Sequence, residues 1–129
     1  MKSWLPLAAL ALAVPGAALA HHSFAAFFDP SKTVTIKGKV TAFRFTNPHG
    51  TIVVQGTGPD GKVREWRAET NAPVVLVRRG WTRGILKPGD QVTIEGWPAR
   101  DGKPWLRLAR ALDAQGRLVG TAPFDQTDG

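Results

Sequence analysis

The three histidines of the chain lie in two short segments. His21 and His22 stand directly before Ser23, and His49 lies in the turn-like segment of residues 46–50. If His21 is the first residue of the processed protein, its α-amine and its imidazole chelate one metal ion, and a second imidazole from elsewhere completes a T-shaped set of three nitrogens. Amine and imidazole ligands favour copper(II) by the Irving–Williams order. The spacing therefore predicts a copper site of the histidine-brace type.

In this hypothesis His21 supplies the amine and one ring nitrogen, His49 supplies the second imidazole, and His22 is a substitute or an outer partner. Asp29 or Asn47 would hydrogen-bond to a ligating ring and orient it without binding the metal itself. Zinc fits less well, because the chain has three histidines and no cysteine. We therefore expect copper, if there is any cofactor.

Two alternatives remain open for the histidines. The amine, the next amide nitrogen and the His22 imidazole can bind copper without any folded partner. Otherwise the His-His pair is only a polar mature start, and His49 bonds only within its own turn.

The first twenty residues decide whether His21 has a free amine. Lys2 precedes an apolar run over residues 5–13, and Pro15 and Gly16 lead to the small-x-small sequence Ala18-Leu19-Ala20. This order of a basic residue, an apolar run and a small-x-small sequence predicts a secretion signal cleaved after Ala20, with general secretion into the periplasm. The apolar run is too short for a membrane anchor, so we expect none after cleavage.

The composition limits the mature protein to one domain. Cleavage after Ala20 removes 20 of the 129 residues and leaves 109, with 16 of the 17 basic side chains against 10 acidic ones, a net charge of +6. This length suffices for one core. The absence of cysteine excludes a disulfide framework and a thiolate metal site.

The alternation of polar and apolar residues predicts a mainly β protein. Gly38 would allow the long first strand to bend, and a hairpin is predicted at residues 58–61. A short helix is expected around residues 73–77, and a loose polar tail over 121–129. We expect one domain over residues 21–120, with strands at 33–45, 51–55, 62–69, 91–97 and 104–113.

Three strands, one helix and two strands is the order of the OB-fold, a small five-stranded Greek-key barrel. A plain β-sandwich is the competing architecture, but it needs about seven strands or more. We therefore predict a small OB-like barrel with one short helix between its third and fourth strands.

A second set of residues combines aromatic rings with cations. On an OB barrel the second and third strands carry the ligand face, which predicts an alternative ligand face formed by Arg64, Trp66, Arg67, Trp97 and Arg107. Its partner would be an anionic envelope glycan, a lipid headgroup or a protein, and export argues against nucleic acid. The competing interpretation is that the tryptophans cap the ends of the core.

Signatures of hydrolytic enzymes are missing from the sequence, including Gly-x-Ser-x-Gly and His-Glu-x-x-His. Glu65 and Glu69 are interpreted as surface partners of Arg64 and Arg67. We therefore expect a monomeric protein that buffers or delivers a metal rather than an enzyme. The alternative is a metal-free binding module.

Four separated motifs also resemble a family of small exported proteobacterial proteins of unknown function. They are the mature start His-His-Ser-Phe, the turn Thr46-Asn47-Pro48-His49, the stretch Arg78-Arg79-Gly80-Trp81-Thr82 and the stretch Leu86-Lys87-Pro88-Gly89-Asp90. The resemblance covers about residues 20–120 and implies an exported, β-rich single domain. It implies no activity, so the metal hypothesis depends on the histidines alone.

Overall fold

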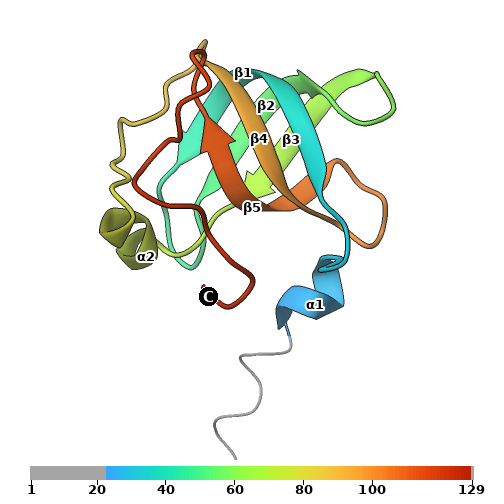
Figure 1. Cartoon of the computed structure of the whole chain (residues 1–129), viewed down its shortest axis with the longest axis horizontal. Helices are drawn as coiled ribbons and strands as arrows, with labels where there is room; N and C mark the ends of the chain where they lie inside the picture. Colours follow the sequence, from blue (N-terminus) through green and yellow to red (C-terminus); the bar gives the residue numbers. More distant parts are fainter. Residues whose placement is uncertain (1–22, 129) are drawn as a thin grey trace, which may run out of the picture.

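A computed structural model describes residues 23–128 of the chain. The predicted signal peptide, His21 and His22 lie outside the described residues. The elements, in order, are α1 (Ser23–Phe27), β1 (Val34–Arg44), β2 (Thr51–Thr57), β3 (Val63–Glu69), α2 (Pro73–Arg78), β4 (Gln91–Pro98) and β5 (Trp105–Leu112) (Figure 1).

The five strands close into a barrel in the order β1-β2-β3-β5-β4. The pairing of β3 with β5 is parallel, and the other four pairings are antiparallel. The short helix α2 connects β3 to β4, on the lower left of Figure 1. The predicted mainly β, five-stranded barrel with one short helix between strands three and four is confirmed.

The long first strand bends at a different place from the one the sequence suggested. The pairing of β1 with β2 shifts register between Val40 and Ala42, so the irregularity follows Val40. Gly38 serves close packing instead, because a Cβ at this position would collide with the carbonyl of Gln55 on β2. A glycine inside a strand can mark such a close approach as well as a bend.

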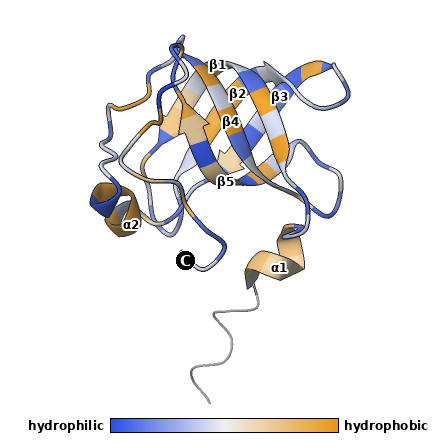
Figure 2. Cartoon of the chain, in the orientation of Figure 1, coloured by the Kyte–Doolittle hydropathy of each residue, from blue (hydrophilic) through white to orange (hydrophobic). Residues whose placement is uncertain are grey.

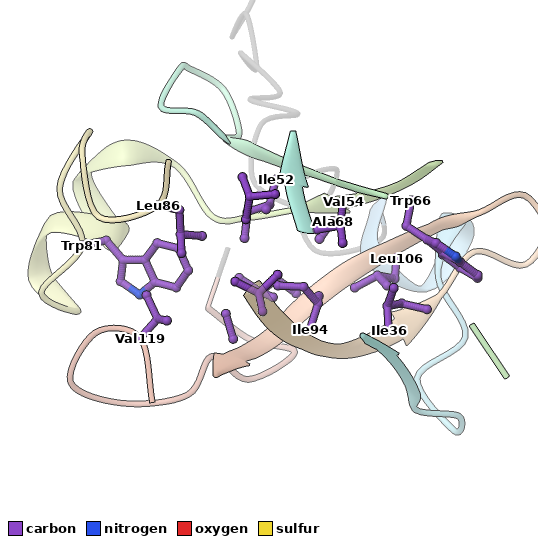
Figure 3. Close-up of a cluster of buried hydrophobic side chains, with 14 of the residues drawn as sticks. Ile36, Ile52, Val54, Trp66, Ala68, Trp81, Leu86, Ile94, Leu106 and Val119 are labelled. Carbon is purple, nitrogen blue, oxygen red and sulfur yellow. The ribbon is translucent and has the colours of Figure 1, made fainter. Parts of the chain in front are cut away.

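Alternation along the strands separates the core from the surface, and Figure 2 shows hydrophobic and hydrophilic residues taking turns along them. The inward side chains include Ile36, Ile94 and Leu106, all fully buried. Trp66 lies at one end of this cluster and Trp81 at the other (Figure 3). Both indoles therefore close the ends of the barrel core, as the competing interpretation of the tryptophans expects.

The last residues are packed against the barrel, whereas the sequence suggested a loose tail from residue 121. Phe124 is buried, its ring centroid lies 5.9 Å from that of Trp81, and its N–H donates to the carbonyl of Ala109. Arg79 donates to both carboxylate oxygens of Asp128 at 2.8 and 2.9 Å. One apolar anchor and one ion pair thus hold residues 124–128 in place.

Two of the four motifs have structural roles in this fold. Gly80, with φ of +76°, ends α2 in a conformation that favours glycine, and Trp81 then enters the core. Gly89, with φ of +96°, makes the tight turn before β4, and Leu86 packs in the core beside it. Within residues 23–128, neither helix is long and apolar enough to cross a membrane.

Candidate functional site

His49 belongs to a cluster of three charged or titratable side chains on the outside of the barrel. Its Nδ1 lies 2.9 Å from Oε1 of Glu69, and Nη1 of Arg107 donates to the same oxygen at 3.0 Å. One carboxylate oxygen therefore connects the histidine of the turn to an arginine of β5.

The strand register brings these residues together. Glu69 is the last residue of β3 and lies between Thr51 on β2 and Arg107 on β5. Ala68 and Leu106, which precede Glu69 and Arg107, are buried in the core, so Glu69 and Arg107 point outward by the alternation of the strands. His49 stands two residues before Thr51, which places its ring over the end of β3.

Burial differs across the cluster. The Arg107 side chain is 8% exposed, Glu69 is 21% exposed, and His49 is 41% exposed. Burial lowers the pKa of Arg107 below its usual value, and the charge of Glu69 and its hydrogen bond offset only part of this decrease. A guanidinium remains protonated in proteins, so Arg107 is a fixed cation that holds the Glu69 carboxylate in place.

The contact with Glu69 also distinguishes the two ring nitrogens of His49. A carboxylate accepts hydrogen bonds but does not donate them, so its position favours the proton on Nδ1. The lone pair of the neutral ring then lies on Nε2, which is the nitrogen left to bind a ligand. The side chain is exposed enough for a ligand to reach it.

The backbone next to His49 is tied to the segment that follows Glu69. The N–H of Thr70 donates to the carbonyl of Gly50 at 2.9 Å, and the N–H of Gly50 points back to the carbonyl of Asn71 at 3.3 Å. A Cβ on Gly50 would collide with Oγ1 of Thr70 and crowd the carbonyl of Arg44. This close packing fixes the main chain that carries the histidine.

The beginning of the described chain lies near the same face. The ring centroid of Phe24 in α1 is 5.5 Å from that of Trp97, and Trp97 on β4 pairs in register with Arg107 on β5. The main chain at Phe27 and the side chain of Arg100 add hydrogen bonds that hold α1 against the β4–β5 hairpin. Figure 1 shows α1, α2 and the C-terminal segment on the lower side of the barrel.

A family model described as "Family of unknown function (DUF6152)" matches residues 9–106, about three quarters of the chain. The chain belongs to this family. The resemblance to a family of unknown function is thereby confirmed, whereas the export that it implied stays a prediction. The DUF6152 match brings no activity with it. The chain matches no curated protein and no solved structure.

Of the two residues expected to orient a ligating ring, Asp29 bonds to other residues of this DUF6152 domain, whereas the role of Asn47 stays a prediction. Oδ1 of Asp29 accepts hydrogen bonds from the side chain and main chain of Ser31, which lower the pKa of Asp29 to about 2, and its other oxygen pairs with Lys32. Asn47 is exposed and precedes Pro48 through a cis peptide bond. The carboxylate beside His49 is Glu69 instead.

The interpretation of the two glutamates of β3 is correct for one of them. Glu65 pairs with Arg67 at 3.3 Å on the surface, as expected. Glu69 contacts His49 and Arg107, neither of which is a neighbour in sequence. The length of the hairpin loop decides the register. The loop spans residues 58–62, so Thr57 pairs with Val63 and Glu69 lies opposite Thr51, whereas the predicted turn at residues 58–61 would place Ala68 there.

The residues of the alternative ligand face divide between the core side and the outer side of the strands. Trp66 is buried in the core, whereas Arg67, the next residue on β3, is exposed on the outside. Arg64 pairs with Asp60 in the hairpin, and Arg107 bonds to Glu69. Trp97 lies one strand further along, under Phe24 of α1.

Across residues 23–128, no three His, Cys, Asp or Glu side chains come together in a group that could hold a metal ion. Within residues 23–128, His49 is the one histidine. The other two imidazoles of the chain belong to His21 and His22, which lie outside the described residues.

Proposed function

We propose that this protein binds copper(II) through Nε2 of His49 together with the α-amine and imidazole of His21, and that it buffers or delivers the metal in the periplasm. The observation that carries the proposal is the contact of His49 Nδ1 with Glu69, whose carboxylate is in turn bonded to Arg107.

This contact is the kind that accompanies ligating histidines in proteins. A carboxylate at one ring nitrogen orients the imidazole, sets its tautomer and increases the basicity of the other nitrogen. The Arg107 side chain is nearly buried, so its ion pair with Glu69 restricts the movement of the Glu69 carboxylate. The ring is thus prepared to present Nε2 to a metal ion without a large loss of side-chain entropy.

The N-terminal segment has the reach that the proposal requires. Trp97, under Phe24, lies two strands away from Glu69, with Arg107 between them, and two strand spacings amount to roughly 10 Å. Residues 21–23 span up to about 10 Å when extended, and the side chains add to this reach. An amine and a ring from His21 can therefore meet the ring of His49.

A half-exposed site of three nitrogens suits exchange of the metal with other carriers. The His49 side chain keeps contact with solvent, and the residues around it supply one carboxylate that is already bonded to a cation. Buffering or delivery therefore accounts for the site better than catalysis does. The periplasmic location rests on the export signal predicted for residues 1–20.

The test is copper(II) titration of the processed protein, with intact mass used to fix its first residue. We expect one tightly bound ion, and loss of affinity in two variants: His49→Gln, and a protein with one alanine added before His21. Each should lose more than the roughly 10–100-fold that removal of an outer hydrogen bond costs.

His22→Gln is the matched control, because it removes a neighbouring imidazole and leaves the proposed set intact. Unchanged affinity in His49→Gln, or a loss confined to His22→Gln, would mean that copper binds to the N-terminal peptide alone and would refute the proposal.

A further inference from the structure

A groove of about 510 Å³ runs over the outer face of β3 and β5, next to the cluster around His49. Arg67 and Trp105, which pair in register across the two strands, both line it. They lie two residues before Glu69 and Arg107, so the groove and the histidine cluster share one face of the barrel. The groove is lined by Arg44, Thr51, Glu65, Arg67, Lys103, Pro104 and Trp105.

One wall of the groove is a fixed aromatic ring. The Trp105 centroid lies 4.7 Å from that of Phe28 in an edge-to-face arrangement, and Phe27 approaches it at 6.3 Å. These contacts hold the indole in place, while its remaining surface lines the groove beside Pro104. A rigid, flat, apolar wall of this kind binds flat ligand surfaces at low entropic cost.

The charges around the wall are mixed. Arg44, Arg67 and Lys103 contribute three cations, and Glu65 contributes one carboxylate. Arg67 contacts Glu65 at 3.3 Å, and both side chains are more than half exposed, so this pair is weak and open to exchange. The groove thus offers donors for a carboxylate and one acceptor for hydroxyl groups.

We propose that this groove binds an acidic glycan, with the apolar face of a sugar ring against Trp105, its carboxylate on Arg44 and Lys103, and its hydroxyl groups toward Glu65. The volume is within the usual range of small-ligand sites. A polyphosphate fits less well, because Glu65 repels a ligand that carries only negative charge and has no donors. The proposal does not depend on copper.

The experiment uses the processed protein in the presence of EDTA and measures binding of short oligogalacturonates by calorimetry. The neutral methyl ester of the same oligomer and inorganic polyphosphate are the comparison ligands. We expect binding of the acid that weakens with added salt, and much weaker binding of the ester and of polyphosphate.

The decisive variant is Arg44→Gln combined with Lys103→Gln, which removes two exposed cations of the groove. Its matched control is Lys39→Gln combined with Arg117→Gln, which changes the net charge equally at exposed positions outside the groove lining. We expect about tenfold weaker binding in the first variant and little change in the second, since each lost contact is a charge-assisted hydrogen bond at the surface.

Equal losses in the two double variants, equal binding of acid and ester, tighter binding of polyphosphate, or no binding of the acid would each overturn the proposal. His49→Gln should bind the oligomer as the native protein does. A failure of the copper site therefore leaves this result unchanged, and the two proposals can fail separately.

Discussion

The strand β3 carries two polar regions that use similar residues in different surroundings. At the end of the strand, Glu69 connects His49 to Arg107, which is 8% exposed. At its start, Arg64 pairs with Asp60, and Arg67 pairs with Glu65, with both pairs open to solvent. The first region joins three elements of the fold, whereas the second joins residues within four positions of each other.

This difference shows which charges fix geometry. Exposed ion pairs contribute little, because water screens them and their side chains must lose freedom to form them. A partly buried pair is different, because removal of one partner leaves the other charged and poorly solvated. The cluster at His49 is therefore a fixed feature of the fold. The exposed pairs of Arg64 and Arg67 can be replaced with little effect on it.

The largest expected effect on stability comes from Glu69→Ala, which leaves Arg107 without its partner. We expect a loss of about 2–3 kcal/mol in the free energy of unfolding, below the roughly 3–5 kcal/mol for fully buried pairs because Glu69 retains some exposure. Urea denaturation measures it. The control is Glu65→Ala on the same strand, with an expected loss below about 0.5 kcal/mol; equal losses would remove the distinction between the two regions.

Glu69→Gln tests how much the negative charge of Glu69, rather than the shape of its side chain, contributes to orienting the His49 ring. The amide is similar in shape to the carboxylate but holds the Nδ1 proton of His49 less strongly, so copper affinity should fall by about 10–100-fold. A competition assay with a chelator of known affinity measures this change. Glu65→Gln should leave the affinity as it is, and a similar decrease in both variants would assign the effect to net charge.

The hairpin pair gives a smaller effect. Arg64→Gln removes the partner of Asp60 and should change the free energy of unfolding by less than about 0.5 kcal/mol. Addition of salt should have little further effect on this variant, because the screened interaction is already gone. A loss above about 1 kcal/mol in urea would show that exposed pairs also stabilise this barrel.

The smallest effect concerns the acid stability contributed by Asp29, whose side chain is 16% exposed. Its pKa is lowered from 3.8 to about 2 by hydrogen bonds from Ser31. The folded state binds this proton less readily than the unfolded state, so the contribution is complete above pH about 4 and disappears as the pH falls toward 2. Asp29→Asn should therefore flatten that part of the acid unfolding curve, and an unchanged curve would contradict the assignment.

The sequence predicts the fold well because the fold depends on local patterns. The alternation at Ile36 and Val40, the hairpin at residues 58–61 and the glycine after α2 each act within a few residues. The position of the bend in β1 was missed, because it is set by the register with β2 rather than by Gly38. The packed C-terminal segment was missed because Phe124 meets Trp81 only in the folded chain.

The site was harder to predict from the sequence, because its contacts also form only in the folded chain. His49 stood out by its residue type, but its partner Glu69 resembled Glu65, the other glutamate of β3. The contact depends on the register between β2 and β3, and Arg107 joins it only through the parallel pairing of β3 with β5. Residue types therefore suggested the ligand, whereas long-range pairing decided what orients it.

The most direct test of the copper proposal is electron paramagnetic resonance of the copper(II) protein, with nitrogen ligands counted in the native form and in His49→Gln. The proposal predicts three coordinated nitrogens in the processed native protein and two in the variant. Identical spectra from the two proteins would show that the His49 ring is not a ligand, and its contact with Glu69 would then only stabilise the turn.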